Sequence, residues 1–154
     1  MTSQQVSLSR IVLGILALGA LLAQFVMIPR IAKGYANTYP EVADLASPYV
    51  IVVAAAIGGF EVALLAAWQL LAAYEEGSPS GRSKRWIDGM AVSLCLMALL
   101  IAGICVHAGS VAEVGGPAML FGVLGSVALI AVVGAARSRA LASVQERYGG
   151  PLPR

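Results

Sequence analysis

Four long apolar segments that contain no Lys or Arg limit what this chain can fold into more than any other feature. Each has 18 residues or more, so as a helix it rises about 27 Å or more and crosses most of a hydrocarbon core about 30 Å thick. The chain is also 59% hydrophobic and 12% charged, outside the usual range of soluble domains. The segments run from Ile11 to Ile28, from Pro48 to Tyr74, from Gly89 to Val106 and from Pro117 to Ala136.

The sequence therefore predicts an all-α, four-transmembrane-helix integral membrane bundle that forms a single membrane domain over residues 1–154. We expect helices at about 8–29, 48–74, 87–107 and 117–147, followed by a disordered tail at 149–154. Arg10 before an apolar stretch also fits the start of a signal peptide. The stretch is longer than a signal core of about 7 to 15 residues, so a retained helix is preferred.

The connection between the first two spans carries its own local signals. Thr38 and Glu41 have the spacing of a capping box, which predicts a short helix on the outer surface. Ser47 followed by Pro48 is the pattern of an N-cap with Pro at the first helical position, so the second span should begin there. Pro29 should kink or end the first helix.

The distribution of Lys and Arg predicts the orientation. Two of these residues, Arg30 and Lys33, lie between the first and second spans, and none lies between the third and fourth. The other eight lie before the first span, between the second and third, or after the fourth. Because cytoplasmic loops carry the excess of basic residues, both termini should face the cytoplasm of a multi-pass protein in the cytoplasmic (inner) membrane. This distribution explains the net charge of +2 better than a nucleic-acid surface does.

Glu61 is the acid inside the second span, 13 residues from each end of the run from Pro48 to Tyr74. A charge at that depth is costly, and no Lys, Arg or His lies at a comparable depth in the other spans. We therefore expect a neutral Glu61, hydrogen-bonded across the bundle or to a backbone carbonyl. Ser126 lies at a matching depth, and Gln24 is another polar residue within a span. A proton or ion relay through Glu61 is the alternative.

Small residues in the spans predict helix packing. They form pairs spaced i, i+4, which places both members on one helix face where another backbone can approach closely. The pairs are Ala54 with Gly58, Ala55 with Gly59, and Gly122 with Ser126. The neighbour on these faces could belong to this chain, to a second copy in a homo-oligomer, or to a partner protein.

Signs of catalysis are scarce. Cys95 and Cys105 lie about 15 Å apart on one helix, so they cannot bridge each other, and buried free thiols are expected. His107 should be an interfacial imidazole, with Glu113 as a candidate partner. The sequence contains no recognisable nucleophile, phosphate-loop or metal-ligand motif. It predicts no cofactor, no metal site and no enzymatic activity.

Three stretches of the first half resemble a bacterial family of small four-helix membrane proteins, the domain-of-unknown-function family twenty-nine seventy-five. They are Gly19 to Gln24, the P-E-V-A-x-L segment at Pro40 to Leu45 with Pro48 after it, and V-A-L-x-x-x-W-x-L at Val62 to Leu70. The resemblance implies the four-helix fold and a bacterial, often actinobacterial, source. It also implies that a neutral amide such as Gln is more usual at the position of Glu61, which favours a hydrogen-bonding role there.

The small size, the small-residue faces and the lack of catalytic groups predict a non-catalytic accessory or regulatory subunit. Its partners would be the lipid bilayer and a larger membrane protein complex, a bacterial respiratory assembly being one candidate host. The alternative is a small proton- or ion-coupled transporter, or a channel-like oligomer, that uses Glu61.

Overall fold

The structure, a computed structural model, describes residues 3–38, 40, 43–75, 81–110 and 116–148, and all of its regular elements are helical. They are α1 (Ser3–Leu22), the π-helical segment η1 (Ala23–Met27), α2 (Ile28–Thr38), α3 (Ala43–Glu75), α4 (Gly81–Ser110) and α5 (Pro117–Tyr148). Four helices in this part of the chain are long and apolar enough to cross a membrane. The predicted all-α class with four such helices is confirmed. The predicted disordered tail, 149–154, lies outside the described residues.

Of the two outcomes predicted at Pro29, a kink or an end of the first long helix, the end is wrong. The helix continues through α2 to Thr38, because the turns just before the proline widen into η1. There the backbone N–H of Ile28 donates to the Ala23 carbonyl, five residues back. Pro29 has no N–H and its ring crowds the preceding turn, and a wider turn is one way to carry a helix through such a residue.

The second long helix begins at Ala43, five residues before the predicted start at Pro48. Ser47 is therefore not an N-cap, and Pro48 lies inside the helix, where it removes one backbone hydrogen bond of the second turn. The Thr38 hydroxyl donates to the Gly34 carbonyl at 2.9 Å, and the predicted capping box with Glu41 is not tested by the described residues. Glu41 lies outside the described residues.

The predicted short outer helix at Pro40 to Leu45 lies partly outside the described residues: 39, 41 and 42 are not described, and Pro40 is in a 3₁₀ turn. Residues up to Thr38 belong to α2, and those from Ala43 belong to α3. The third long helix begins at Gly81 instead of near 87, so the basic residues Arg82, Lys84 and Arg85 form its first turns. The fourth begins at Pro117, as predicted. These extensions make the helices longer than a hydrocarbon core about 30 Å thick requires.

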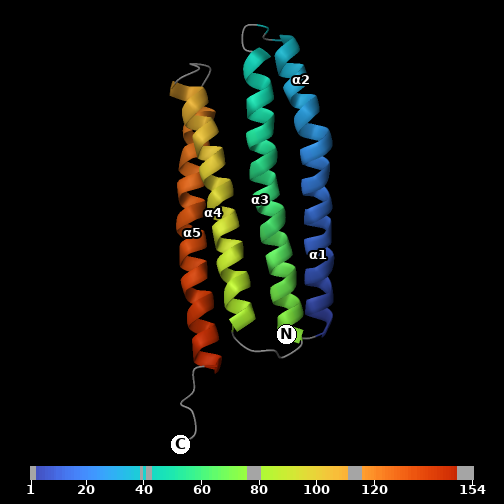
Figure 1. The fold of residues 1–154 in the computed structure, drawn as a ribbon, viewed down its shortest axis with the longest axis vertical. Helices are drawn as coiled ribbons and strands as arrows, with labels where there is room; N and C mark the ends of the chain where they lie inside the picture. The colour runs from blue at the N-terminus through green and yellow to red at the C-terminus, as the bar shows by residue number, and fades with distance from the viewer. Residues whose placement is uncertain (1–2, 39, 41–42, 76–80, 111–115, 149–154) are drawn as a thin grey trace, which may run out of the picture.

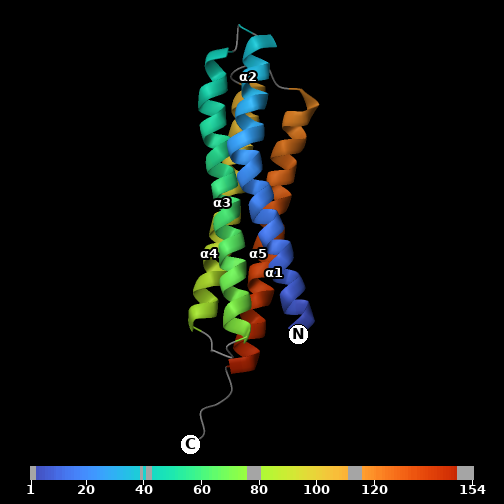
Figure 2. The ribbon, with the colours of Figure 1, turned by 90° about the vertical axis from the view of Figure 1, so that its right-hand side faces the viewer.

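The helices stand in an open row and not in a closed bundle (Figure 1). Along the row, α1, η1 and α2 pack on α3, α3 packs on α4, and α4 packs on α5. Among the described residues, α5 makes no contact with α1, α2 or α3. Figure 2 shows α1 and α2 inclined to α3. The N-terminal end of α1 and the C-terminal end of α5 lie at the same end of the row, the lower end in Figure 1.

Candidate functional site

The first candidate residue, Gln24, lies in the π-helical segment of the first long helix. Its side-chain Nε2 donates to the backbone carbonyl of Ala54 on α3 at 3.3 Å. The other end of the same amide, Oε1, is buried and has no hydrogen-bond partner among the described residues. Gln24 therefore links the two helices with one of its two polar atoms and leaves a buried acceptor unsatisfied, which is costly in an apolar setting.

Glu61 lies on the same side of α3 as this contact. It follows Ala54 by seven positions, which is close to two full turns, so both residues face the first long helix. Its residue surface is only partly covered, but Oε1 is buried and has no hydrogen-bond partner in the part of the chain that is described. The structure thus brings Gln24 and Glu61 to one seam, the line of contact between the first long helix (α1 and η1) and α3.

Ser126 does not join this site. It is 5% exposed, and its hydroxyl donates to the Gly122 carbonyl of its own helix at 2.8 Å. Helix α5 packs only on α4 within the described chain, whereas Glu61 is on α3. The hydrogen bond that matching depths suggested between Glu61 and Ser126 is therefore absent, because the open row keeps α5 away from α3.

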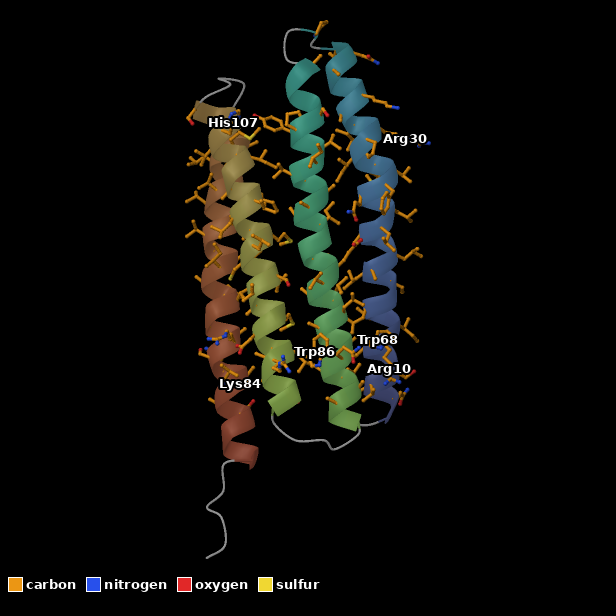
Figure 3. All side chains as sticks on the ribbon, in the orientation of Figure 1. Arg10, Arg30, Trp68, Lys84, Trp86 and His107 are labelled. Atoms are coloured by element: carbon orange, nitrogen blue, oxygen red, sulfur yellow. The ribbon has the colours of Figure 1, made fainter. Side chains whose placement is uncertain are left out.

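Two levels of polar and aromatic side chains mark where the bilayer would lie. Toward the lower end of the row, Figure 3 shows Arg10, Trp68, Lys84 and Trp86 at similar heights, and the Arg10 guanidinium lies 5.7 Å from the centre of the Trp68 ring. Arg30 and His107 lie toward the upper end. Trp and basic residues favour membrane–water interfaces, so the two levels lie where the two faces of a bilayer would be expected.

The spacing of the two levels fits a hydrocarbon core. The 20 residues from Arg10 to Arg30, and the 21 from Trp86 to His107, each rise about 30 Å along a helix. Glu61 precedes Trp68 by seven residues, or about 10 Å. Glu61 therefore lies between the two levels, about two helical turns from the lower one.

Comparison with protein families assigns the chain. A family model described as "Protein of unknown function (DUF2975)" matches residues 30–144, which is most of the chain. The chain belongs to the DUF2975 family. The match begins after α1 and η1, so Gln24 and the resembling stretch from Gly19 lie outside it. No curated protein and no solved structure matched the sequence.

The glycines predicted to pack helices of this DUF2975 protein divide into two groups. A β-carbon added at Gly59 would lie 3.2 Å from the Ser93 carbonyl of α4, and one added at Gly122 would overlap the Cys105 sulfur. These two glycines let α4 approach its neighbours closely. Nothing lies within 4 Å of a β-carbon added at Gly58, and Ala55 is exposed. Ala54 contributes its carbonyl to Gln24 instead.

The spacing of small residues by four missed the more important packing positions of the DUF2975 domain. Apart from Ile87, the buried residues of α3 and α4 are alanines, among them Ala56, Ala63, Ala91 and Ala98, and Ala98 is 0% exposed. Within each helix these pairs are seven residues apart, the period of two helices that pack at a shallow angle. A search for small residues spaced by seven would have found them.

The upper ends of α3 and α4 are joined by a polar contact that the sequence did not suggest. The Tyr49 hydroxyl and His107 Nδ1 share a hydrogen bond of 2.8 Å, and the two rings meet edge to face with centroids 5.9 Å apart. His107 therefore has a partner other than Glu113, which lies outside the described residues.

The lower ends of α4 and α5 are joined by an ion pair. Arg137 donates from Nε to Asp88 Oδ1 at 2.8 Å, and its terminal nitrogen lies 2.8 Å from the same oxygen. Both side chains are partly exposed, at 46% and 37%, so this pair contributes modestly to stability.

Cys95 and Cys105 are free thiols, as their separation on one helix predicted, but both are half-buried and not buried as expected. Among the residues described, no group of three or more His, Cys, Asp and Glu side chains is placed to hold a metal ion. The candidate site of this DUF2975 protein is therefore the polar seam of Gln24, Ala54 and Glu61.

Proposed function

We propose that this chain is a non-catalytic accessory or regulatory subunit that packs against a larger membrane protein complex. The observation that supports the proposal is the open row. Helices α1 and α5 each pack on one side only within the described chain, and both carry large apolar side chains that are well exposed, such as Ile15 and Leu18 on α1 and Phe121 and Val132 on α5. Lipid can cover such faces, but helices of a partner can also pack there.

Small residues on these faces suit close contact with a partner. Gly14 and Gly19 on α1, and Gly125 and Gly134 on α5, have nothing within 4 Å of an added β-carbon. They serve no packing purpose among the described residues, yet each lowers helix propensity. In membrane proteins, small residues on a helix surface allow another helix to approach closely.

The proposal extends to orientation and location. We assign both termini to the cytoplasm of a bacterial inner membrane, with the lower end of the row inside, because eight of the ten basic residues belong to that side. Reporter fusions at the N-terminus and C-terminus, active only in the cytoplasm, should both be active. A reporter placed after Thr38 should be inactive; activity there would reverse the assignment.

The test of the subunit role is purification of the protein from its native membrane in mild detergent, followed by mass spectrometry of the intact assembly. A defined complex with a second protein supports the proposal, and a respiratory assembly is one candidate for that partner. A protein that runs alone, or only with copies of itself, contradicts it.

Substitutions at the outer glycines sharpen this test. Gly125→Leu should remove the partner from the purified complex while the protein itself keeps its thermal stability, because no described atom lies near that position. Gly103→Leu is the matched control, since Gly103 is also exposed and open but lies on α4, which already has a helix on two sides. Retention of the partner in both variants would exclude the α5 face as the contact.

The alternative function is proton- or ion-coupled transport, and one observation favours it: Glu61 Oε1 is buried deep between the two levels of polar residues, without a hydrogen-bond partner. An intramembrane acid commonly marks an ion or proton path. This alternative expects measurable flux in reconstituted vesicles and its loss in Glu61→Gln. If vesicles with the wild-type protein show no flux, and Glu61→Gln is stable, transport is excluded and the subunit role is favoured.

A further inference from the structure

Two buried oxygens in the seam between α1 and α3 lack hydrogen-bond partners among the described residues, Gln24 Oε1 and Glu61 Oε1. Ala54, which accepts the other end of the Gln24 amide, is seven positions from Glu61 on α3, or about 10 Å along the helix. Helical side chains lean toward the N-terminus of their own helix. Because α1 and α3 are antiparallel (Figure 1), Gln24 and Glu61 lean toward each other across this distance.

The chemistry of the two atoms limits what can pair with them. Both are oxygens, so they cannot satisfy each other without a hydrogen. A carboxylate charge at this depth is costly, and the described cation nearest along the seam, Arg10, lies over Trp68, two turns below Glu61. A neutral Glu61 carries its own hydrogen and can donate it.

We propose that Gln24 and Glu61 form one polar site that binds a single water molecule between α1 and α3. Neutral Glu61 donates its O–H to the water, and the water donates to Gln24 Oε1. The Gln24 Nε2 already donates to the Ala54 carbonyl. Every donor then points the same way along a chain of four groups, an arrangement in which each hydrogen bond strengthens the next.

The hydrogen bonds of this site stabilise the packing of α1 on α3. The two helices share much less surface than α3 and α4 do, and Val6 is the one buried apolar residue that α1 contributes among the residues described. The π-helical turn contributes by changing which residues of the helix face α3 on either side of Gln24, since it holds more residues than an α-helical turn. The inference does not depend on which partner the protein binds.

Thermal unfolding of four variants in lipid nanodiscs tests the shared site. Glu61→Leu and Gln24→Leu should each lower Tm by roughly 2 to 4 °C, since each leaves part of the chain unpaired. The double variant should lose less than the sum of the two, because no polar group is then left without a partner. Glu61→Gln, which keeps a donor, should stay near the wild type. Additive losses, or a Glu61→Gln as unstable as Glu61→Leu, would overturn the proposal.

Infrared difference spectra of the wild type against Glu61→Gln test the protonation and the water directly. The wild type should show the C=O stretch of a neutral carboxyl group, and the band should shift when the sample is moved into heavy water. Carboxylate bands alone would contradict the neutral acid. A neutral band without an isotope shift would show that the carboxyl proton does not exchange with water, which contradicts a water bound to this acid. If Tm rises on titration with sodium chloride but not with choline chloride, the site binds a sodium ion, and the proposal of a bound water is wrong.

Discussion

The two interfaces of α3, one with α4 and one with α1, are held by different kinds of contact, and we call them its two seams. Toward α4, α3 presents alanines that are almost completely buried, and Gly59 lies against the Ser93 carbonyl. Toward α1, it presents an amide contact to Gln24, an unpaired acid, and Trp68 beneath Arg10. The α3–α4 seam holds mainly by close packing of small apolar residues, with the Tyr49–His107 hydrogen bond at its upper end. The other holds by a few polar contacts.

The difference follows from the solvent. Lipid tails are as apolar as a helix surface, so helices in a bilayer gain little from hiding apolar side chains and must gain from packing density or polar contacts instead. The α3–α4 and α4–α5 seams lie within the region that defines the DUF2975 family, residues 30–144, whereas α1 lies before it. The four predictions that follow test whether the closely packed half is the more sensitive half.

The largest effect is expected from Ala98→Leu. Ala98 is 0% exposed on α4, so three further carbons would push the helices packed there apart. Overpacking of this kind costs about 1 to 3 kcal/mol. Thermal or denaturant unfolding in nanodiscs measures the change. Ala131→Leu is the control, because Ala131 is exposed on α5 and should change little. Equal losses of stability in Ala98→Leu and Ala131→Leu would contradict close packing around Ala98.

A smaller effect is expected from Gly122→Ala at the α4–α5 seam. The added carbon would overlap the Cys105 sulfur, which has to move, at a cost of about 1 kcal/mol before any gain in helix propensity. Gly125→Ala on the same helix has nothing within 4 Å and should be neutral or stabilising. The double variant Gly122→Ala with Cys105→Ala should recover the loss. A single variant as stable as Gly125→Ala would show that the thiol moves freely.

The sequence predicted the four long helices because uncharged runs of 18 or more residues leave few other folds open. It did not predict how they are ordered in space. Apolar side chains that face lipid and those that face another helix look alike, so Ala55 and Gly58 were expected to pack but have open surroundings. The seven-residue alanine spacing, represented by Ala91 and Ala98, was the informative pattern.

The polar site was only partly predictable for the same reason. The depths of Glu61 and Gln24 follow from counting along each run. Their common seam does not, because it depends on α1 lying beside α3 and on the π-helical turn before Pro29. Counting depth alone suggested Ser126 equally well, and Ser126 bonds within its own helix.

A third prediction concerns the polar contact at the upper end of the closely packed half. Tyr49→Phe removes the hydrogen bond to His107 but keeps the ring that meets the imidazole edge to face. The expected loss is about 0.5 to 1.5 kcal/mol of unfolding free energy. His107→Phe should show a similar loss, and the double variant should lose little more. Independent, additive losses would mean that the hydrogen bond does not couple α3 to α4.

The smallest effect is expected from the ion pair at the lower end. Asp88→Asn removes the charge that Arg137 contacts with two nitrogens, and because both side chains are more than a third exposed, the loss should be about 0.2 to 1 kcal/mol at low salt. Molar salt should shrink the difference from the wild type, since it screens charges over about 3 Å. Lys84→Gln, an exposed change at the same end of α4, controls for net charge. A loss of stability that persists in molar salt would show that Asp88 contributes by packing and not by its charge. The contact between Asp88 and Arg137 would then resemble the small-residue contacts of the closely packed half.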